Sequence, residues 1–255
     1  MPVLDEVSRI VAEAGRIAAA RSGGTFQRWE KGPGNPVCDI DLEVNNFLRE
    51  RLCALDSEAG WLSEETADLS DRIERKRVWV VDPIDGTRDY LKQRSGWAVS
   101  VALVEDRQPV IGVLDAPARG EHWTAAAGRG AWRNAIPIRV SGRAELAGAR
   151  VPADKVPQID ADLVPIDKPN SIALRIALVA AGEADLAATL RWGFEWDIAA
   201  AALIAAEAGA RVSGALGQPL AFNTVSAEAF GVLVATPAIH AAALDRLKAR
   251  AMAVV

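Results

Sequence analysis

Apolar residues in the first part of the chain recur every three or four positions, with charged residues between them. This spacing predicts one amphipathic helix over residues 3–21 and another over residues 41–55. Gly23 and Gly24 end the first helix, and the glycines and prolines of residues 31–36 predict a loop. We expect the apolar faces of both helices to pack against a sheet.

Short apolar runs, which are typical of strands, replace the helical pattern in the middle of the chain. Residues 60–66 form one short strand that ends in acids, and four apolar residues ending at Val81 form the next. We expect Pro83 to stop that second strand. Two apolar runs within residues 98–114 flank a charged turn and predict an antiparallel hairpin, and residues 123–132 predict another.

The stretch from about residue 141 to residue 170 is rich in Pro, Asp, Gly and Ala, so we place a domain boundary there. Residues 1–140 are then an α+β domain with an antiparallel sheet, and residues 141–255 are an α/β domain. Alternating helices and strands in the second half are typical of an α/β domain. The elements expected there are helices over 171–182 and 197–208, a strand over 231–235 and a C-terminal helix.

Composition narrows the classes of function. The chain has 255 residues, a net charge of −5 and a pI near 5.2, which argues against coating a nucleic-acid polymer but leaves a small phosphorylated substrate open. It shows no apolar run of the ~20 residues that span a bilayer and no signal-peptide pattern. Cys38 and Cys53 are too few for a disulfide framework. We therefore expect a cytoplasmic protein that does not bind membranes.

The chain has two histidines, His122 and His240, and this limits the available chemistry. A zinc site built from several histidines is excluded, and a Ser-His-Asp arrangement needs one of these two. Their sequence contexts favour ordinary surface or packed histidines. Catalysis is therefore expected to depend on carboxylates.

Residues 78–87 combine an apolar run with Asp82, Asp85 and the pair Gly86-Thr87. Carboxylates without nearby His or Cys are oxygen ligands suited to Mg²⁺, and the free amides at a helix start favour phosphate. The order of these residues indicates metal-assisted phosphate chemistry. A β-turn with an Asp cap is the alternative interpretation of the same residues.

Further acids stand where neighbouring elements end or begin. Glu64 and Glu65 close one short strand, so pairing with the next strand would bring them to Asp82. Asp197 precedes a run of helix-forming residues, and Asp41 begins the helix that runs to residue 55. For both of these, helix capping is the alternative to metal or catalytic chemistry.

These segments resemble the signature of the inositol monophosphatase superfamily over roughly residues 3–250. The matching segments are Glu64-Glu65-Thr66, Asp82-Pro-Ile-Asp-Gly-Thr87 and Trp196-Asp-Ile-Ala-Ala200, with Asp41 in a fourth where Cys38 replaces the usual threonine. The resemblance implies a layered αβαβα sandwich of the inositol monophosphatase and fructose-1,6-bisphosphatase type. It also implies Mg²⁺-dependent hydrolysis of a phosphomonoester, inhibition by lithium and, as in many members, a homodimer.

The resemblance also assigns roles to residues. Each site is implied to hold two or three Mg²⁺ ions, one bound by Glu64, Asp82 and the carbonyl of Ile84, and another by Asp82, Asp85 and Asp197. The nucleophilic water is implied to be positioned by Thr87, whose hydroxyl donates to Asp41, with Glu64 helping as base. The amides of Gly86 and Thr87 are implied to bind the phosphate.

Two positions favour the 3′(2′),5′-bisphosphate nucleotidase branch of this superfamily. Leu190 stands where inositol phosphatases have an acid that contacts ring hydroxyls, and Arg175 stands where the nucleotidases have a lysine. Arg88, Arg175 and Ser171 are the expected substrate contacts. The two arginines suit a second phosphate because they are cations. Both arginines are also interpretable as ordinary surface charges. The alternatives are an inositol-1-monophosphatase and, more remotely, a non-catalytic regulator that binds a phosphorylated ligand.

Overall fold

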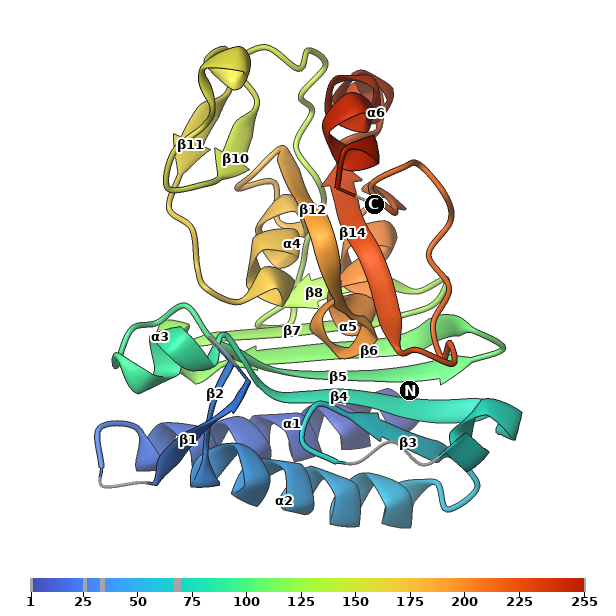
Figure 1. The fold of residues 1–255 in the computed structure, drawn as a ribbon. Helices are drawn as coiled ribbons and strands as arrows, with labels where there is room; N and C mark the ends of the chain where they lie inside the picture. Colours follow the sequence, from blue (N-terminus) through green and yellow to red (C-terminus); the bar gives the residue numbers. More distant parts are fainter. Residues whose placement is uncertain (1, 25–26, 33–34, 67–69, 255) are drawn as a thin grey trace.

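The protein was analysed as a computed structural model, which describes residues 2–24, 27–32, 35–66 and 70–254. Its helices and strands stack in layers (Figure 1). The helices are α1 (Pro2–Arg21), α2 (Asp39–Leu55), α3 (Thr87–Leu91), α4 (Ile172–Ala180), α5 (Glu195–Glu207) and α6 (Pro237–Met252). The strands are β1 (Arg28–Gly32), β2 (Asn35–Cys38), β3 (Gly60–Ser63), β4 (Arg77–Asp85), β5 (Ala98–Glu105), β6 (Gln108–Ala116), β7 (Glu121–Ala126), β8 (Gly130–Arg133), β9 (Ile136–Pro137), β10 (Arg150–Pro152), β11 (Val164–Ile166), β12 (Leu186–Phe194), β13 (Arg211–Ser213) and β14 (Glu228–Ala235).

A seven-stranded sheet forms the centre of the molecule, in the order β3-β4-β5-β6-β7-β8-β9. Strand β3 pairs with β4 in parallel, and the other neighbours are antiparallel. Helices α1 and α2 cover one face, and α4 and α5 cover the other (Figure 1). A three-stranded sheet, β12-β14-β13, lies on the far side of α4 and α5 and packs against α6. The result is the layered αβαβα sandwich that the family resemblance implied.

Strand β4 shows why the apolar run before Asp82 is continuous. Successive side chains of a strand point to opposite faces. Trp79 and Val81 pack with α1 and α2, while Val78 and Val80 pack with α4 and α5. Because helices cover both faces, each position from Val78 to Val81 is apolar.

The hairpins predicted at 98–114 and 123–132 are confirmed as β5–β6 and β7–β8. The prediction that Pro83 stops the strand is wrong, because β4 continues to Asp85 with an irregular register between Asp82 and Asp85. This local break in pairing accommodates the missing N–H of the proline. The loop predicted at 31–36 instead contributes to the β1–β2 hairpin, with residues 33–34 outside the described residues.

The domain boundary predicted near residue 141 stays a prediction. The seven-stranded sheet ends at Pro137, yet one hydrophobic cluster joins Val80 of this sheet, Ala199 of α5 and Val234 of the smaller sheet. Within the described residues, no helix is both long and apolar enough to span a membrane.

Candidate active site

A cavity of about 420 Å³ opens where the end of β4 meets the beginnings of α3, α4 and α5. It brings together most of the residues that the sequence singled out. The predicted residues in its lining are Glu64, Asp82, Ile84, Asp85, Gly86, Thr87, Arg88, Arg175 and Asp197. Segments far apart in the sequence therefore converge on one site, as the resemblance implied.

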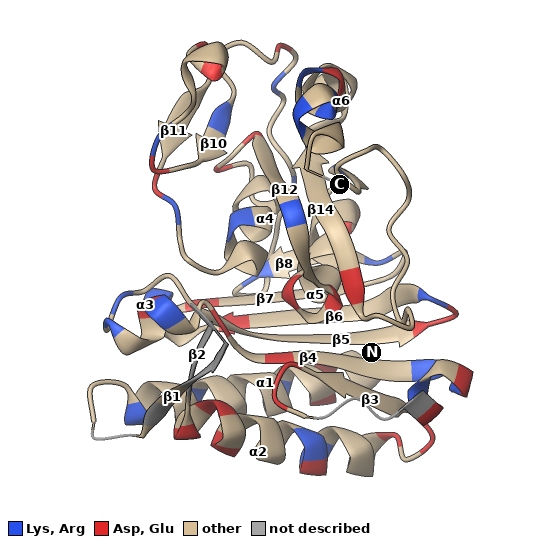
Figure 2. Ribbon diagram, viewed as in Figure 1, with Lys and Arg blue, Asp and Glu red and all other residues tan. Residues whose placement is uncertain are grey.

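Strand pairing explains how Glu64 reaches Asp82. Strand β3 lies parallel to β4 with Ser63 opposite Val81, so the residue after each of these is an acid at the same sheet edge. The amide of Glu64 donates to the carbonyl oxygen of Val81 over 3.3 Å. Figure 2 shows red acidic segments at this end of β4 and at the start of α5, with blue basic segments on α3, α4 and β12.

Asp82 is 2 % exposed, and its Oδ1 accepts a hydrogen bond from the amide of Ile84 over 3.0 Å. Burial raises the pKa of this carboxyl well above its usual range. The nearby carboxylates of Glu64 and Asp85 raise it further, since a second negative charge is disfavoured there. Without a compensating cation, this part of the cavity is electrostatically strained.

Asp85 lies against the first turn of α4. Its carboxylate accepts hydrogen bonds from the hydroxyl of Ser171 over 2.5 Å and from the amide of Ala173 over 2.8 Å. Burial raises the pKa of Asp85, and these hydrogen bonds oppose that shift. Ser171 also accepts from the amide of Leu174 and so caps α4.

Ser171 therefore does not take the substrate-binding place that we expected for it. It is fully buried and orients Asp85 from behind instead of lining the cavity. The physical reason is its position before α4, where a short hydroxyl side chain satisfies a free helical amide.

Gly86 allows the turn that follows Asp85 to lie close to the start of α4. Its φ is +93°, and a Cβ there would lie 2.7 Å from the carbonyl oxygen of Gly96 and 2.9 Å from the amide nitrogen of Ser171. Only glycine fits both the backbone conformation and the space.

Asp197 enters the cavity from the first turn of α5. Its carboxylate accepts from the amide of Phe194 over 3.3 Å. The N-cap of α5 is Phe194, so Asp197 is not the N-cap that the alternative interpretation expected but the third residue of the helix, which bonds back to the N-cap amide. Burial, followed by the charge of Asp85, raises the pKa of Asp197 to about 7. The residue thus bonds to the start of its helix and also adds a negative charge to the cavity.

The hydrogen bond expected between Thr87 and Asp41 is replaced in this structure. The Thr87 hydroxyl donates its one hydrogen to the carbonyl oxygen of Ile84 over 3.0 Å. Asp41 lies in the first turn of α2, and its Oδ2 accepts from both the amide and the thiol of Cys38, over 2.8 and 2.9 Å. Cys38 is thus the N-cap residue of α2, and Asp41 accepts from it.

The residue types fit divalent cations, although their positions do not enclose an ion. The side chains are oxygen donors, and burial together with mutual repulsion raises the pKa of Asp82 and Asp197, which a cation would reverse. In the described part of the chain, no three His, Cys, Asp or Glu side chains are grouped closely enough to hold a metal. Binding therefore requires side-chain adjustment around the ion.

The basic residues of the cavity differ in how they are held. Arg88 is exposed, whereas Arg175 is half-buried and donates to the carbonyl oxygens of Pro169 and Asn170 over 2.8 and 2.6 Å. Sequence reasoning missed seven further lining residues, and four of them are basic or aromatic. These four are Lys168, Arg191, Trp192 and Phe194. No motif marks them, and the strand β12 that carries three of them was not predicted.

Both histidines lie outside this cavity and have hydrogen-bond partners. His122 contacts Ser8 through Nε2 and Asp115 through Nδ1, each over 2.7 Å, which ties α1 to the β6–β7 hairpin. Ser8 lies within α1, and none of these three residues lines the cavity. His240 contacts Ser213 over 3.0 Å. The expectation of packed histidines is confirmed.

Comparisons with known proteins agree with this geometry. The model of the inositol monophosphatase family matches residues 2–254. The chain is 30% identical to the 3′(2′),5′-bisphosphate nucleotidase CysQ of Aggregatibacter actinomycetemcomitans, over 87% of each chain. It is 32% identical to an inositol-1-monophosphatase of Mesorhizobium japonicum, over 83% of this chain and 85% of the relative.

Among solved structures, the IMPase of Thermotoga maritima superposes with a TM-score of 0.86 and 25% identity, covering 99% of each chain. Fold, cavity and sequence thus lead to the same class of protein, whose members are generally metal-dependent, typically on Mg²⁺. The chain belongs to the inositol monophosphatase family and is a phosphatase that acts on phosphoric monoesters.

Proposed function

We propose that this phosphatase is a 3′(2′),5′-bisphosphate nucleotidase, which releases phosphate from adenosine 3′,5′-bisphosphate and leaves AMP. The observation that carries this proposal is the composition of the cavity wall. Beside the acids, basic side chains and two exposed aromatic rings line the same space. A substrate with two phosphates and a planar base matches such a wall.

Arg191 supports a site for the second phosphate. Its exposed side chain lines the cavity, and the described residues offer it no ion-pair partner. Arg175 is less available because two of its nitrogens already donate to backbone carbonyls. A guanidinium without a counter-ion attracts a phosphate, with which it forms paired hydrogen bonds. We therefore assign the second phosphate chiefly to Arg191, with Arg175 beside it.

Trp192 and Phe194 support recognition of a base. Their side chains are 55 % and 40 % exposed. Phe194 stacks on Trp196 with ring centroids 4.4 Å apart, and Trp192 packs edgewise on Phe230 at 5.4 Å. Each exposed ring is therefore held in place by another ring, which prepares a surface on which a nucleobase can stack.

Leu190 also supports a nucleotidase, because its side chain has no hydrogen-bonding group. It packs against the small cluster of Ala215 and Phe230. Leucine cannot accept hydrogen bonds from ring hydroxyls, which a polyol substrate such as inositol phosphate would need.

The chemistry proposed for the site assigns a task to each predicted residue. The residues that would hold the metal ions are Glu64, Asp82, Ile84, Asp85 and Asp197. Bound Mg²⁺ would supply an activated water and neutralise charge on the phosphoryl oxygens. Glu64 would take a proton from the attacking water, and Thr87 would position that water. The amides of Gly86 and Thr87 would bind the transferred phosphate.

A substrate panel with Mg²⁺ tests the proposal. We expect kcat/KM for adenosine 3′,5′-bisphosphate to exceed that for inositol 1-phosphate at least tenfold, with fructose 1,6-bisphosphate and histidinol phosphate as further comparisons. The second candidate is an inositol-1-monophosphatase, which the similarity to the Mesorhizobium relative favours. Equal or better kcat/KM for inositol 1-phosphate would overturn our choice in favour of that candidate.

A further inference from the structure

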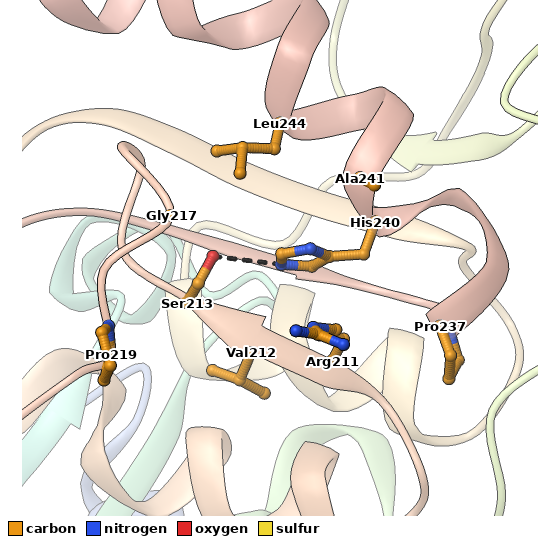
Figure 3. A pocket seen from close by; sticks show the side chains of 9 residues that line it. All are labelled: Arg211, Val212, Ser213, Gly217, Pro219, Pro237, His240, Ala241 and Leu244. Atoms are coloured by element: carbon orange, nitrogen blue, oxygen red, sulfur yellow. Dashed lines mark hydrogen bonds between the residues drawn. The ribbon is translucent and has the colours of Figure 1, made fainter.

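A second cavity, of about 380 Å³, lies between β13 and the first turns of α6. Figure 3 shows His240 and Leu244 projecting from α6 toward Arg211 and Ser213 of β13. It shares no lining residue with the cavity of the phosphatase site. The two cavities therefore do not overlap.

The loop after β13 forms one wall of this cavity and is closely held. The amide of Gly214 donates to the carbonyl oxygen of Gln218 over 2.8 Å, which closes the turn. Gly217 has a φ of +89°, and a Cβ there would lie 2.7 Å from Cδ2 of Leu244. Backbone packed against α6, and not mobile side chains, thus shapes this wall.

Arg211 brings an uncompensated positive charge to the cavity. The structure describes no acidic partner for its exposed side chain. Other arginines of the same half are paired, such as Arg150 with Asp185 and Arg246 with Asp162. None of the residues that line this cavity is acidic. An anionic ligand would supply the missing counter-charge.

His240 adds a second polar contact deeper in the cavity. It is 5 % exposed, and its Nε2 lies 3.0 Å from the hydroxyl of Ser213. That hydroxyl also donates to the carbonyl oxygen of Gly214 over 3.0 Å. Because that contact uses the hydroxyl hydrogen, Ser213 accepts from Nε2–H of His240. Nδ1 has no partner among the described residues, so it is available to a ligand as an acceptor.

The start of α6 also borders the cavity, through Pro237. This helix is sixteen residues long and begins at Pro237, and no side chain caps it. The hydroxyl of Thr236, which could have done so, donates instead to the carbonyl oxygen of Arg143 over 3.1 Å. Pro237 has no N–H and the amide of Ile239 donates to the carbonyl oxygen of Thr236 over 3.2 Å, so α6 adds to the potential from Arg211 through the positive end of its dipole.

We propose that this cavity is a second ligand site, which binds a small phosphate monoester that carries an apolar or planar group. The phosphate oxygens would accept from Arg211, and the P–OH of the monoanion would donate to Nδ1 of His240. Val212, Pro219 and Leu244 supply apolar walls for the rest of the ligand. The volume of about 380 Å³ lies within the range of sites for small molecules.

Isothermal titration with phenylphosphonate tests this proposal on the whole chain in EDTA, which removes divalent cations from the phosphatase cavity. Arg211→Gln removes the charge, and Ala241→Phe fills the cavity from an exposed position of α6 without altering that charge. Arg49→Gln is the matched control, because Arg49 is an exposed arginine of α2, outside both cavities.

We expect one phenylphosphonate per chain, with affinity reduced at least tenfold in both cavity variants and unchanged in the control. All three variants should keep the kcat/KM of the phosphatase reaction, which shows that they fold. Absence of binding to the unmodified protein would overturn the proposal. Equal affinity in Arg211→Gln and Arg49→Gln would overturn it as well.

Discussion

At the scale of single residues, Asp82 has the strongest conflict between stability and function. Its carboxyl is almost fully buried, and other acids of the cavity surround it. Burial and these like charges raise its pKa, so the ionised form destabilises the metal-free fold. A side chain retained under such strain is typical of a site that binds a cation.

Replacing Asp82 by asparagine should therefore abolish Mg²⁺-dependent phosphate release and raise the unfolding temperature in EDTA. Asparagine keeps an acceptor for the amide of Ile84 but removes one repelling charge. Differential scanning calorimetry and a phosphate-release assay measure the two effects. Asp245→Asn, at an exposed position of α6, is the control and should change neither. Near-normal turnover by Asp82→Asn would remove this residue from the site.

Trp192 offers a test of base recognition. Trp192→Leu should lower kcat/KM for adenosine 3′,5′-bisphosphate roughly tenfold or more, because stacking on one base contributes about 1–3 kcal/mol. Trp192→Phe should retain most of the activity, since it keeps an aromatic face. The kcat/KM for glycerol 2-phosphate, which has no ring, should not change. A similar loss for both substrates would show a structural role instead.

Sequence reasoning at this scale found the acids and missed their neighbours. The residues from Asp82 to Thr87 form a compact motif, and strand pairing supplies Glu64. Arg191 and Trp192 belong to no motif, because an exposed strand position beside the cavity imposes no fixed sequence pattern. Ser171 was assigned to substrate because a hydroxyl beside a helix does not reveal whether it faces the cavity or the neighbouring Asp85.

At the scale of elements, helix beginnings organise the site. The first turn of α4 binds Asp85, while the first turn of α5 carries Asp197. The acids are thus held by free helical amides at positions where negative charge is favoured. Strand β4 delivers Asp82 and Asp85 to these helix ends through the irregular pairing around Pro83.

The elements that could be predicted are those with a strong period or a full apolar run. Helices α1 and α2 and the hairpin β5–β6 meet that condition. Strand β12 is not predicted because Leu186–Phe194 shows neither a continuous apolar run nor a clean alternation, and its burial falls toward its end. Strand β13 is three residues long, too short to give any periodic signal.

Asp185 joins several elements and gives a prediction of pH dependence. It is 2 % exposed and accepts from Nε and Nη2 of Arg150 and from the hydroxyl of Ser141. Burial opposes ionisation, yet these hydrogen bonds lower the pKa of Asp185 below its usual value. Because the folded-state pKa is the lower one, this stabilisation is present above the unfolded-state pKa. It is lost as the pH falls through the folded-state value.

We expect Asp185→Asn to lower the free energy of unfolding by about 1.5–3 kcal/mol at pH 7, the contribution typical of hydrogen bonds to a charged group. The loss should be equal at pH 7 and pH 5 and shrink only below about pH 4. Urea denaturation at each pH measures it. Asp162→Asn, which removes an exposed partner of Arg246, should have a smaller effect. A loss that grows toward acid pH would contradict the assignment.

At the scale of the whole molecule, one hydrophobic cluster joins the large sheet, α4 and α5, and the small sheet. The cavity lies at the edge of this cluster, where residues from all three layers meet. A ligand that neutralises the cavity acids therefore stabilises contacts between layers. Strand pairing predicted that Glu64 lies near Asp82, but only the family resemblance indicated that Asp197 joins them.

Mg²⁺ should accordingly raise the unfolding temperature of the whole chain. A ligand at one hundred times its Kd contributes about 2.7 kcal/mol, which corresponds to roughly 5–10 °C for a chain of this size. Thermal unfolding in Mg²⁺ and in EDTA measures the shift. Asp82→Asn should show little difference between the two conditions. An identical shift in this variant would place the stabilising cation elsewhere.

Anomalous diffraction from crystals soaked in Mn²⁺, at concentrations that support phosphate release, tests the central claim most directly. The account predicts Mn²⁺ within the cavity, bound by carboxylate oxygens of Asp82 and of its neighbours Glu64, Asp85 or Asp197. Under activity-supporting conditions, a cavity without anomalous density, or density confined to other parts of the molecule, would contradict it.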